Sequence, residues 1–288
     1  GQTSLGQFDV NGQRPNANYF TVDGVSANLG TTWSVMQGDA AFGTAPIMNA
    51  QGGTNGMISV DAMQEFRIQT SNYAPEFGRT PGGQISITSK SGGNQWHGTA
   101  SDYIRNDFFD ARNYFNTVGE PQAKLRQHDF GGTLSGPIWK DHTFFFFSYE
   151  GLRLKEPTIG QITNVIEASE LAKVPSTSGW YPLLPGFLTT SGPADNASTC
   201  GQGTLGSTYV PCYGHINYVG SNPSNFDAIS IRIDQNITKK LTAFGRFMRE
   251  PSNSTVFQTP NNGNYSASNI ETMTVGLTWT ISPSMVND

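Results

Sequence analysis

The sequence is poor in charge and contains no long apolar run. Charged residues make up 14% of its 288 residues, against roughly 25% in an average soluble domain. No stretch reaches the about 18 consecutive apolar residues expected of a transmembrane helix. The net charge of −5 comes without a basic stripe, which nucleic-acid-binding proteins usually carry. The composition therefore argues against a charged helical bundle, a helical membrane protein and a nucleic-acid partner.

Histidine is also scarce, and the common catalytic motifs are absent from the sequence. The four histidines are scattered, at His97, His128, His142 and His215. No Gly-x-Ser-x-Gly, His-Glu-x-x-His or Cys-x-x-Cys motif occurs, and the carboxylates show no local pairing that suggests acid–base work. We therefore expect neither an enzyme nor a bound cofactor.

The two cysteines, Cys200 and Cys212, flank a short polar loop that contains glycines and a proline. This arrangement favours a local disulfide formed in an oxidising compartment. The alternative is a pair of unrelated free thiols. A metal site is not expected, because only His215 lies nearby and zinc usually takes four ligands.

Small polar residues and aromatics are plentiful instead. The sequence has 33 glycines and 18 phenylalanines, and 11% of its residues are aromatic. This composition is typical of a β-rich protein with large loops. The mean hydropathy of −0.39 does not exclude a membrane β-barrel, because only alternate residues of a barrel strand need to be apolar.

From about Trp96 onward, several segments alternate apolar and polar residues with a period of two. Such segments are strands with one apolar and one polar face. A soluble sandwich would turn the apolar face toward its core, whereas a membrane barrel would turn it toward lipid. The segment 241–250 is less regular, because Phe244 and Met248 occupy polar positions. The expected strands are 96–105, 127–138, 143–152, 228–235, 241–250 and 270–281.

The lengths of the connections favour the barrel. Tight turns are expected after Ile138, Gln235 and Ile281, and long connections at about 106–126, 154–226 and 251–269. Bacterial barrels have short periplasmic turns and longer extracellular loops. Trp139 and Trp279 both fall near the short-turn end, as in an aromatic girdle at a membrane interface.

The N-terminal part carries shorter elements. Residues 19–25 predict a strand that ends in an Asp-Gly turn. Ser59 or Asp61 is placed to cap one helical turn, and strands are expected at 65–70 and 84–90.

These N-terminal motifs resemble the end of the plug domain of TonB-dependent receptors. The resemblance is carried by Val60–Ile68, Tyr73–Arg79 and Gly82–Lys90, and Thr21–Val25 resembles the plug's earlier Asp-Gly turn. Later segments resemble the Oar-like subfamily of these receptors. They are Asn94–Thr99, Arg105–Asp107, Asp110–Phe115, Phe130–Ile138, Lys140–Phe146, Tyr149–Arg153, Arg232–Asn236 and Phe244–Arg246.

The resemblance implies a mainly β protein in the outer membrane of a Gram-negative bacterium. Residues 1–93 would form the C-terminal part of the plug, and residues 94–288 the first strands, about six of the roughly 22 of such a barrel, with long extracellular loops. A fragment truncated at both ends is expected. The implied partners are outer-membrane lipid, an unknown extracellular ligand, and the TonB-ExbB-ExbD complex, which would act through a missing N-terminal segment.

Two sets of site residues follow from this resemblance. Arg67 and Arg79 would pair with lumen-facing carboxylates such as Glu150 or Asp234, and so hold the plug until it is pulled. The alternative is solvated surface charge.

An extracellular ligand surface is the second expected site. The loop around Cys200–Cys212 would form it with Trp180, Tyr181, Tyr209 and Tyr213. The alternative is that these aromatics serve loop packing. The runner-up for the whole chain is a secreted β-sandwich adhesin or glycan-binding module. That protein would be a soluble monomer, whereas an isolated barrel fragment would aggregate through its open edge.

Overall fold

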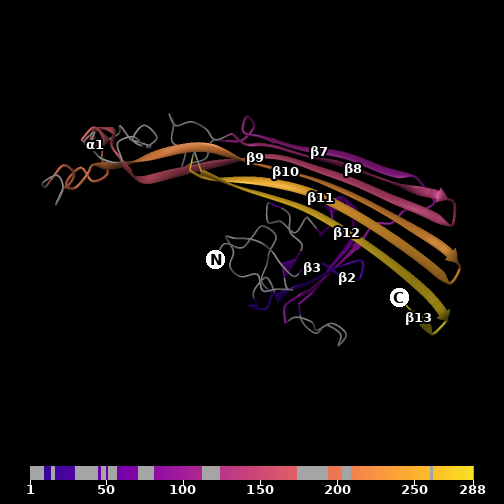
Figure 1. Ribbon diagram of the computed structural model, residues 1–288. Coiled ribbons are helices and arrows are strands. Elements are labelled where there is room, and N and C mark those ends of the chain that lie inside the picture. The colour runs from indigo at the N-terminus through magenta and orange to yellow at the C-terminus, as the bar shows by residue number, and fades with distance from the viewer. Residues whose placement is uncertain are drawn as a thin grey trace.

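The computed structural model describes residues 10–13, 17–29, 45–46, 50, 57–70, 81–111, 124–173, 194–202, 209–259 and 262–287. These residues form a large antiparallel sheet, a small four-stranded sheet and a two-stranded ribbon (Figure 1). The ribbon pairs β3 (Asn28–Leu29) with β4 (Ala45–Pro46). Within the described ranges, no helix has the length and apolar character needed to cross a membrane.

The large sheet is a meander in which each strand pairs antiparallel with the next along the chain. Figure 1 shows its strands side by side in one curved layer, with the small sheet on one side of it. Its strands are β7 (His97–Asn106), β8 (Arg126–Trp139), β9 (Thr143–Ile166), β10 (Tyr213–Thr238), β11 (Leu241–Thr259), β12 (Asn262–Ser282) and β13 (Met285–Asn287). The short helix α1 (Ala168–Leu171) follows β9.

The three predicted tight turns are confirmed. They occupy 140–142, 239–240 and 283–284. Asp141 adopts a positive φ of 65°, and the side chain of Asn94 donates a hydrogen bond of 2.7 Å to its carboxylate. Trp139 and Trp279 lie at this end of their strands, and both are exposed.

The predicted long connection at 251–269 is wrong. β11 and β12 pair continuously from Pro251 opposite Asn269 to Val256 opposite Asn264, and only residues 260–261 separate the two strands. The connection predicted at 154–226 is also shorter, at 167–212, because β9 and β10 both extend into it. These polar segments remain strands because the neighbouring backbones satisfy their hydrogen bonds, which does not require apolar side chains. Short and long links therefore do not strictly alternate.

The small sheet has the order β2-β1-β6-β5. Its strands are β1 (Tyr19–Val22), β2 (Val25–Ser26), β5 (Met63–Gln69) and β6 (Gln84–Ser89), with the 3₁₀ turn η3 (Val60–Ala62) before β5. β1 runs parallel to β6 and antiparallel to β2. The predicted Asp-Gly turn joins β1 to β2, with φ of 49° at Asp23 and 82° at Gly24, which is the pattern of a type I′ hairpin turn.

The hydrophobic core lies between the two sheets. It contains Phe20, Val22, Ile85 and Ile87 from the small sheet, together with Phe146, Met248 and Ile270 from the large one. Met248 is completely buried. Its apolar side chain at a polar position of the strand pattern is thus explained, since this face of β11 packs on the small sheet.

The opposite face of the large sheet carries aligned rows of apolar side chains. The register brings one row together across five strands, and most of its members are exposed, Met273 by 77%. No described residue outside the sheet packs over this row. The row consists of Leu134, Phe147, Ile231, Phe247 and Met273.

Candidate functional site

A buried cluster of charges joins the two sheets. Asp23, from the turn after β1, lies with Oδ2 2.9 Å from Nε of Arg246 on β11 and with Oδ1 3.3 Å from Nη1 of Arg232 on β10. The side chains of Asp23, Arg246 and Arg232 are only 2%, 3% and 12% exposed. The contact with Arg246 has the geometry of an ion pair more than of an aligned hydrogen bond.

Arg232 holds three further contacts. Its Nη2 lies 2.8 Å from Oδ1 of Asp234, its Nη1 donates a hydrogen bond of 2.8 Å to Oγ of Ser89, and its guanidinium lies 4.2 Å from the ring centre of Phe244. Two aspartates and two arginines therefore form a quartet without net charge, which we call the Asp23 quartet (Asp23, Arg232, Asp234 and Arg246). Neutrality is what permits this burial, because an unpaired buried charge is very costly.

The strand register explains why a negative charge is needed at the position of Asp23. Arg232 and Arg246 stand directly opposite each other on β10 and β11, and like charges in opposite positions destabilise a ladder. Asp23 supplies the missing counter-charge from the other sheet. Its carboxylate also accepts hydrogen bonds from the backbone N–H and the hydroxyl of Ser89, at 2.8 and 2.9 Å, so its position is fixed from both sides.

Because Gly276 has no side chain, the Phe244 ring has room to lie against the guanidinium of Arg232. A Cβ atom at Gly276 would lie 2.1 Å from Cε1 of the Phe244 ring, a distance that no side chain tolerates. Phe244 is the second irregular position of the β11 pattern, and the cluster explains it.

Two more contacts tie the N-terminal region to the large sheet. The hydroxyl of Ser59 donates a hydrogen bond to Oε2 of Glu150 on β9, and the backbone N–H of Ala50 donates one of 3.0 Å to Oγ of Ser252 on β11. Ser59 stands at the N-cap position of η3, as the sequence suggested, but its side chain makes no capping bond. The polar contacts thus extend along the face that carries the core.

Among the described residues, the predicted gating side chains do not pair with one another. Arg67 lies exposed on β5 and forms no ion pair with any residue in the described ranges, and Arg79 lies outside them. Glu150 accepts its bond from Ser59, and Asp234 pairs with Arg232. The charges that meet across the two sheets are reversed relative to the expectation, since the acid comes from the small sheet and the arginines from the large one.

The predicted ligand loop is partly described. Cys200 and Cys212 are joined as a disulfide. Tyr209 donates its hydroxyl to the Glu170 carboxylate at 2.9 Å, and the backbone N–H of Tyr213 donates to the side chain of Asn196 at 3.1 Å. Trp180 and Tyr181 lie outside the described residues.

Glu170 links α1 to this loop. Burial raises the pKa of its carboxyl, but hydrogen bonds from Lys173 and Tyr209 outweigh that effect and hold the pKa below its ordinary value. The same bond to Glu170 raises the pKa of the Lys173 ammonium. Tyr209 therefore serves the internal order of the loop.

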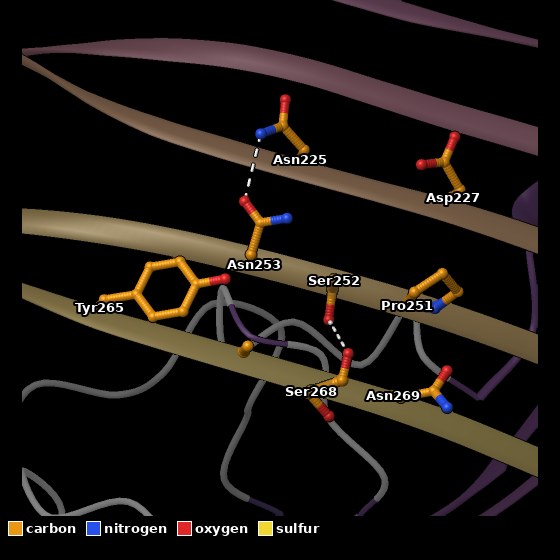
Figure 2. Close-up of a pocket in the computed structure, with 9 residues that line it drawn as sticks. Asn225, Asp227, Pro251, Ser252, Asn253, Tyr265, Ser268 and Asn269 are labelled. Carbon is orange, nitrogen blue, oxygen red and sulfur yellow. Dashed lines mark hydrogen bonds between the residues drawn. The ribbon is translucent and has the colours of Figure 1, made fainter.

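A polar hollow of about 420 Å³ opens on the far parts of β10, β11 and β12 (Figure 2). The side chains of Asn225 and Asn253 point toward one another there, joined by a hydrogen bond of 3.2 Å. The sequence pattern does not predict this hollow, because most of its lining lies where β11 and β12 lack a regular alternation of apolar and polar residues. It is lined by Asn225, Asp227, Pro251, Ser252, Asn253, Tyr265, Ala267, Ser268 and Asn269. Among the described residues, no group of histidine, cysteine or acidic side chains is arranged to hold a metal ion.

Comparison with known proteins agrees with this architecture. Residues 88–288 match the family model described as "Outer membrane beta barrel domain". The chain belongs to this outer-membrane β-barrel family. The strands β7 to β13 all fall inside the matched region.

One curated relative supports the Oar-like resemblance of this β-barrel chain. The TonB-dependent transporter Oar of Myxococcus xanthus is 34% identical over 145 residues, which are 49% of this chain and 12% of that protein. The crystal structure of the outer-membrane transporter YddB from Escherichia coli has a TM-score of 0.57 at 10% identity, and the match covers 97% of this chain and 32% of that one. The chain thus spans about a third or less of each of these proteins.

These findings confirm the mainly β fold class and the resemblance to Oar-like TonB-dependent proteins, and they place the chain in an outer-membrane barrel. Both of these matched proteins are transporters. The β-sandwich alternative is wrong, because the apolar rows lie on the outer face of a barrel-like sheet and face no second sheet within the described chain.

Proposed function

We propose that this chain is part of a TonB-dependent transporter that admits an extracellular solute through a plugged β-barrel, with energy from the TonB-ExbB-ExbD complex. Residues 1–93 would then be the C-terminal part of the plug, and residues 94–288 the first part of the barrel wall. The observation that carries this proposal is the Asp23 quartet. It ties the small sheet to the inner face of the wall through buried charge.

The quartet is suited to a contact that must hold and then release. In a buried, low-dielectric setting, removing one partner of an ion pair costs about 3–5 kcal/mol, because the other charge is left uncompensated. Once water enters between the sheets, the same charges are hydrated and their attraction weakens steeply. A pull on the plug that admits water would therefore lower the barrier to further opening.

The function requires recognition and gating, and breaks no bond in the solute. A barrel of about 22 strands encloses a lumen that must be plugged. Opening it means displacing β1, β2 and η3 from the wall, because these elements bring Asp23 and Ser59 to their partners. The transported solute would enter along the wall vacated by them.

A double-mutant cycle in the full-length protein tests this role. Each of Asp23→Asn and Arg246→Gln leaves the buried quartet with one uncompensated charge, whereas the double variant leaves the neutral pair of Arg232 and Asp234. We expect each single variant to admit a large antibiotic that the intact outer membrane excludes, and the double variant to leak less than the two effects combined. The matched control is Arg249→Gln, which removes an arginine whose pair with Glu271 is exposed.

The proposal fails if Asp23→Asn is as tight as the unchanged protein, or if the two substitutions act additively. Cell-surface abundance of each variant is measured in parallel, so that a leak is compared at equal numbers of barrels.

A further inference from the structure

We propose that a basic patch on the outer wall, formed by Arg126, His128, Arg153 and Lys155, binds the phosphate of a lipid headgroup in the surrounding outer leaflet. The patch lies on β8 and β9, on the face opposite the small sheet. The inference depends on the place of this family in the outer membrane, and not on the gating role proposed for Asp23.

The height of the patch follows from the strand pattern. On β9, the outward positions are apolar or aromatic from Phe145 to Tyr149, and the first charged one is Arg153. At the usual rise of about 3.3 Å per residue, about 26 Å of strand separates Phe145 from Arg153. With strands tilted by 35–45°, this corresponds to about 20 Å of height, which approaches the apolar band of roughly 25 Å in such barrels.

On the neighbouring strands, the outward side chains also change from apolar to charged at about this height. The first charged outward residue of each strand, counted from the tight turns, lies close to the same register. The side chains at this level pair with one another, as Arg249 does with Glu271 at 3.3 Å and Arg153 with Asp227 at 2.8 Å. These first charged residues are Asp102, Arg126, Arg153, Asp227, Arg249 and Glu271. The line marks the interface between the hydrocarbon and the headgroups on the side away from the tight turns.

The basic patch departs from this balance of charge. In the ladder of β8 and β9, Arg126 stands directly opposite Lys155, and His128 directly opposite Arg153. The two cations Arg126 and Lys155 are therefore like charges in opposite positions, which destabilise a ladder. The Asp23 quartet solves the same problem on the inner face with an aspartate from the other sheet.

On the outer face, the described residues supply acid to only half of the patch. Asp227 pairs with Arg153, and Asp102 lies 3.5 Å from His128. No carboxylate in the described ranges lies within ion-pair distance of Arg126 or Lys155, and both side chains are exposed. An anion from outside the chain would complete the pairing.

A phosphate group has the chemistry that this patch requires. It carries up to two negative charges and accepts several hydrogen bonds, and a guanidinium can bind it with two parallel N–H groups. The patch faces outward at the depth of the headgroups, so the surrounding lipid delivers its phosphate there without leaving the membrane. Since β8 and β9 are flanked by β7 and β10, the patch is complete within this chain.

The test uses the full-length protein in nanodiscs of phosphatidylcholine that contain phosphorylated lipid A. Retained lipid is counted by native mass spectrometry, and the same lipid A after phosphatase treatment serves as the comparison. The variant Arg126→Gln/Lys155→Gln removes the two cations that lack an acid. Each charge near a membrane surface contributes about five-fold in affinity, so we expect retention to fall about 25-fold.

Two further variants separate binding from structure. Lys239→Gln/Lys240→Gln removes the same number of charges from an exposed turn at the other end of the barrel, and should leave lipid retention unchanged. Arg126→Lys/Lys155→Arg keeps the charges and should retain the lipid. Equal retention of dephosphorylated lipid A, an equal loss in the Lys239 and Lys240 variant, or displacement of the lipid by inorganic phosphate would overturn the proposal.

Discussion

Nε of Arg246 lies 2.9 Å from Oδ2 of Asp23, although one residue belongs to the wall of the large sheet and the other to a turn of the small sheet. Both side chains are almost completely buried, and Arg232 shares the same carboxylate. An apolar interface would tolerate sliding, whereas a buried pair of charges fixes one position of the small sheet against the wall. The contact is therefore better suited to a defined closed state than further apolar area would be.

Replacing Asp23 by Asn should loosen the small sheet while preserving its shape. The amide can still accept the hydrogen bonds from Ser89, but Arg246 loses its acidic partner, and Asp234 alone then balances the two arginines. We expect the stability of the contact to fall by about 3 kcal/mol. Hydrogen–deuterium exchange should then be faster in the amides of β1 and β6, and nearly unchanged in β11.

Arg249→Gln is the comparison for that measurement. Its pair with Glu271 is exposed on both sides, and such surface pairs contribute about 0–1 kcal/mol. If both substitutions accelerated hydrogen exchange equally, the buried Asp23 contact would stabilise the protein no more than the exposed pair of Arg249 and Glu271 does.

Gly276→Ala should disturb the same cluster through packing alone. The new Cβ atom would meet the Phe244 ring at 2.1 Å and push it from its place under Arg232. Overpacking of this kind costs about 1–3 kcal/mol. Thermal unfolding of the full-length protein should show the loss, and Phe244→Leu in the Gly276→Ala background should recover part of it. A Gly276→Ala protein as stable as the original would show that Phe244 moves aside freely.

Much of the large sheet could be predicted from the sequence, because alternation is a local signal. The alternation of Ile229, Ile231 and Ile233 with polar residues can be recognised within eight residues of sequence. Tight turns are expected where such alternation ends. The far parts of β11 and β12 were missed for a physical reason. Above the apolar band, a strand needs no apolar face, so its side chains carry little information and only the neighbouring backbones keep it extended.

The candidate site was less predictable, because it depends on contacts between distant segments. The sequence shows two arginines on strands that a tight turn joins, and the register then requires an acid near both. It does not show which acid. Asp23 appears in the sequence only as a turn residue. Charge alone suggests Arg67 and does not show which face of β5 meets the large sheet.

The order of the loop beyond β9 should depend on pH through Glu170. Its pKa in the folded loop lies below the ordinary value near 4.5. Ionised Glu170 therefore stabilises the loop above that value, and the stabilisation is lost as the pH falls through the lower, folded pKa. The raised pKa of Lys173 acts at the other end of the range: its contribution is complete below about 10.5 and is lost as the pH rises through the folded value.

Limited proteolysis of residues 167–212 measures this dependence. Cleavage should be slowest near neutral pH and should accelerate toward acid, and Glu170→Gln should flatten the acid limb. Glu167→Gln is the matched control. It removes an acid from the same turn whose carboxylate, among the described residues, accepts a hydrogen bond from Ser169 alone. Tyr209→Phe should raise cleavage at all pH values, since it removes one hydrogen bond worth about 1 kcal/mol.

The apolar rows on the outer face should prove to be in contact with lipid, and Val275 is the position at which to measure it. Val275 is exposed and lies beside Gly245 on β11, among aligned apolar positions. A lysine there would place a charge in hydrocarbon, which costs about 2–4 kcal/mol near the midplane and about 0–1 near the interface. Val275→Lys should therefore reduce the folding free energy of the full-length protein in phosphatidylcholine bilayers by the larger amount, and Asn269→Lys, on the same face of β12 but above the charged level, by the smaller. Two results would contradict this orientation: equal costs for the two lysines, or a spin label at Val275 that is as shielded from lipid-dissolved quenchers as one at the buried Thr274. In either case the isoleucine and valine rows would have to face protein, and the outward orientation of the whole sheet would be wrong.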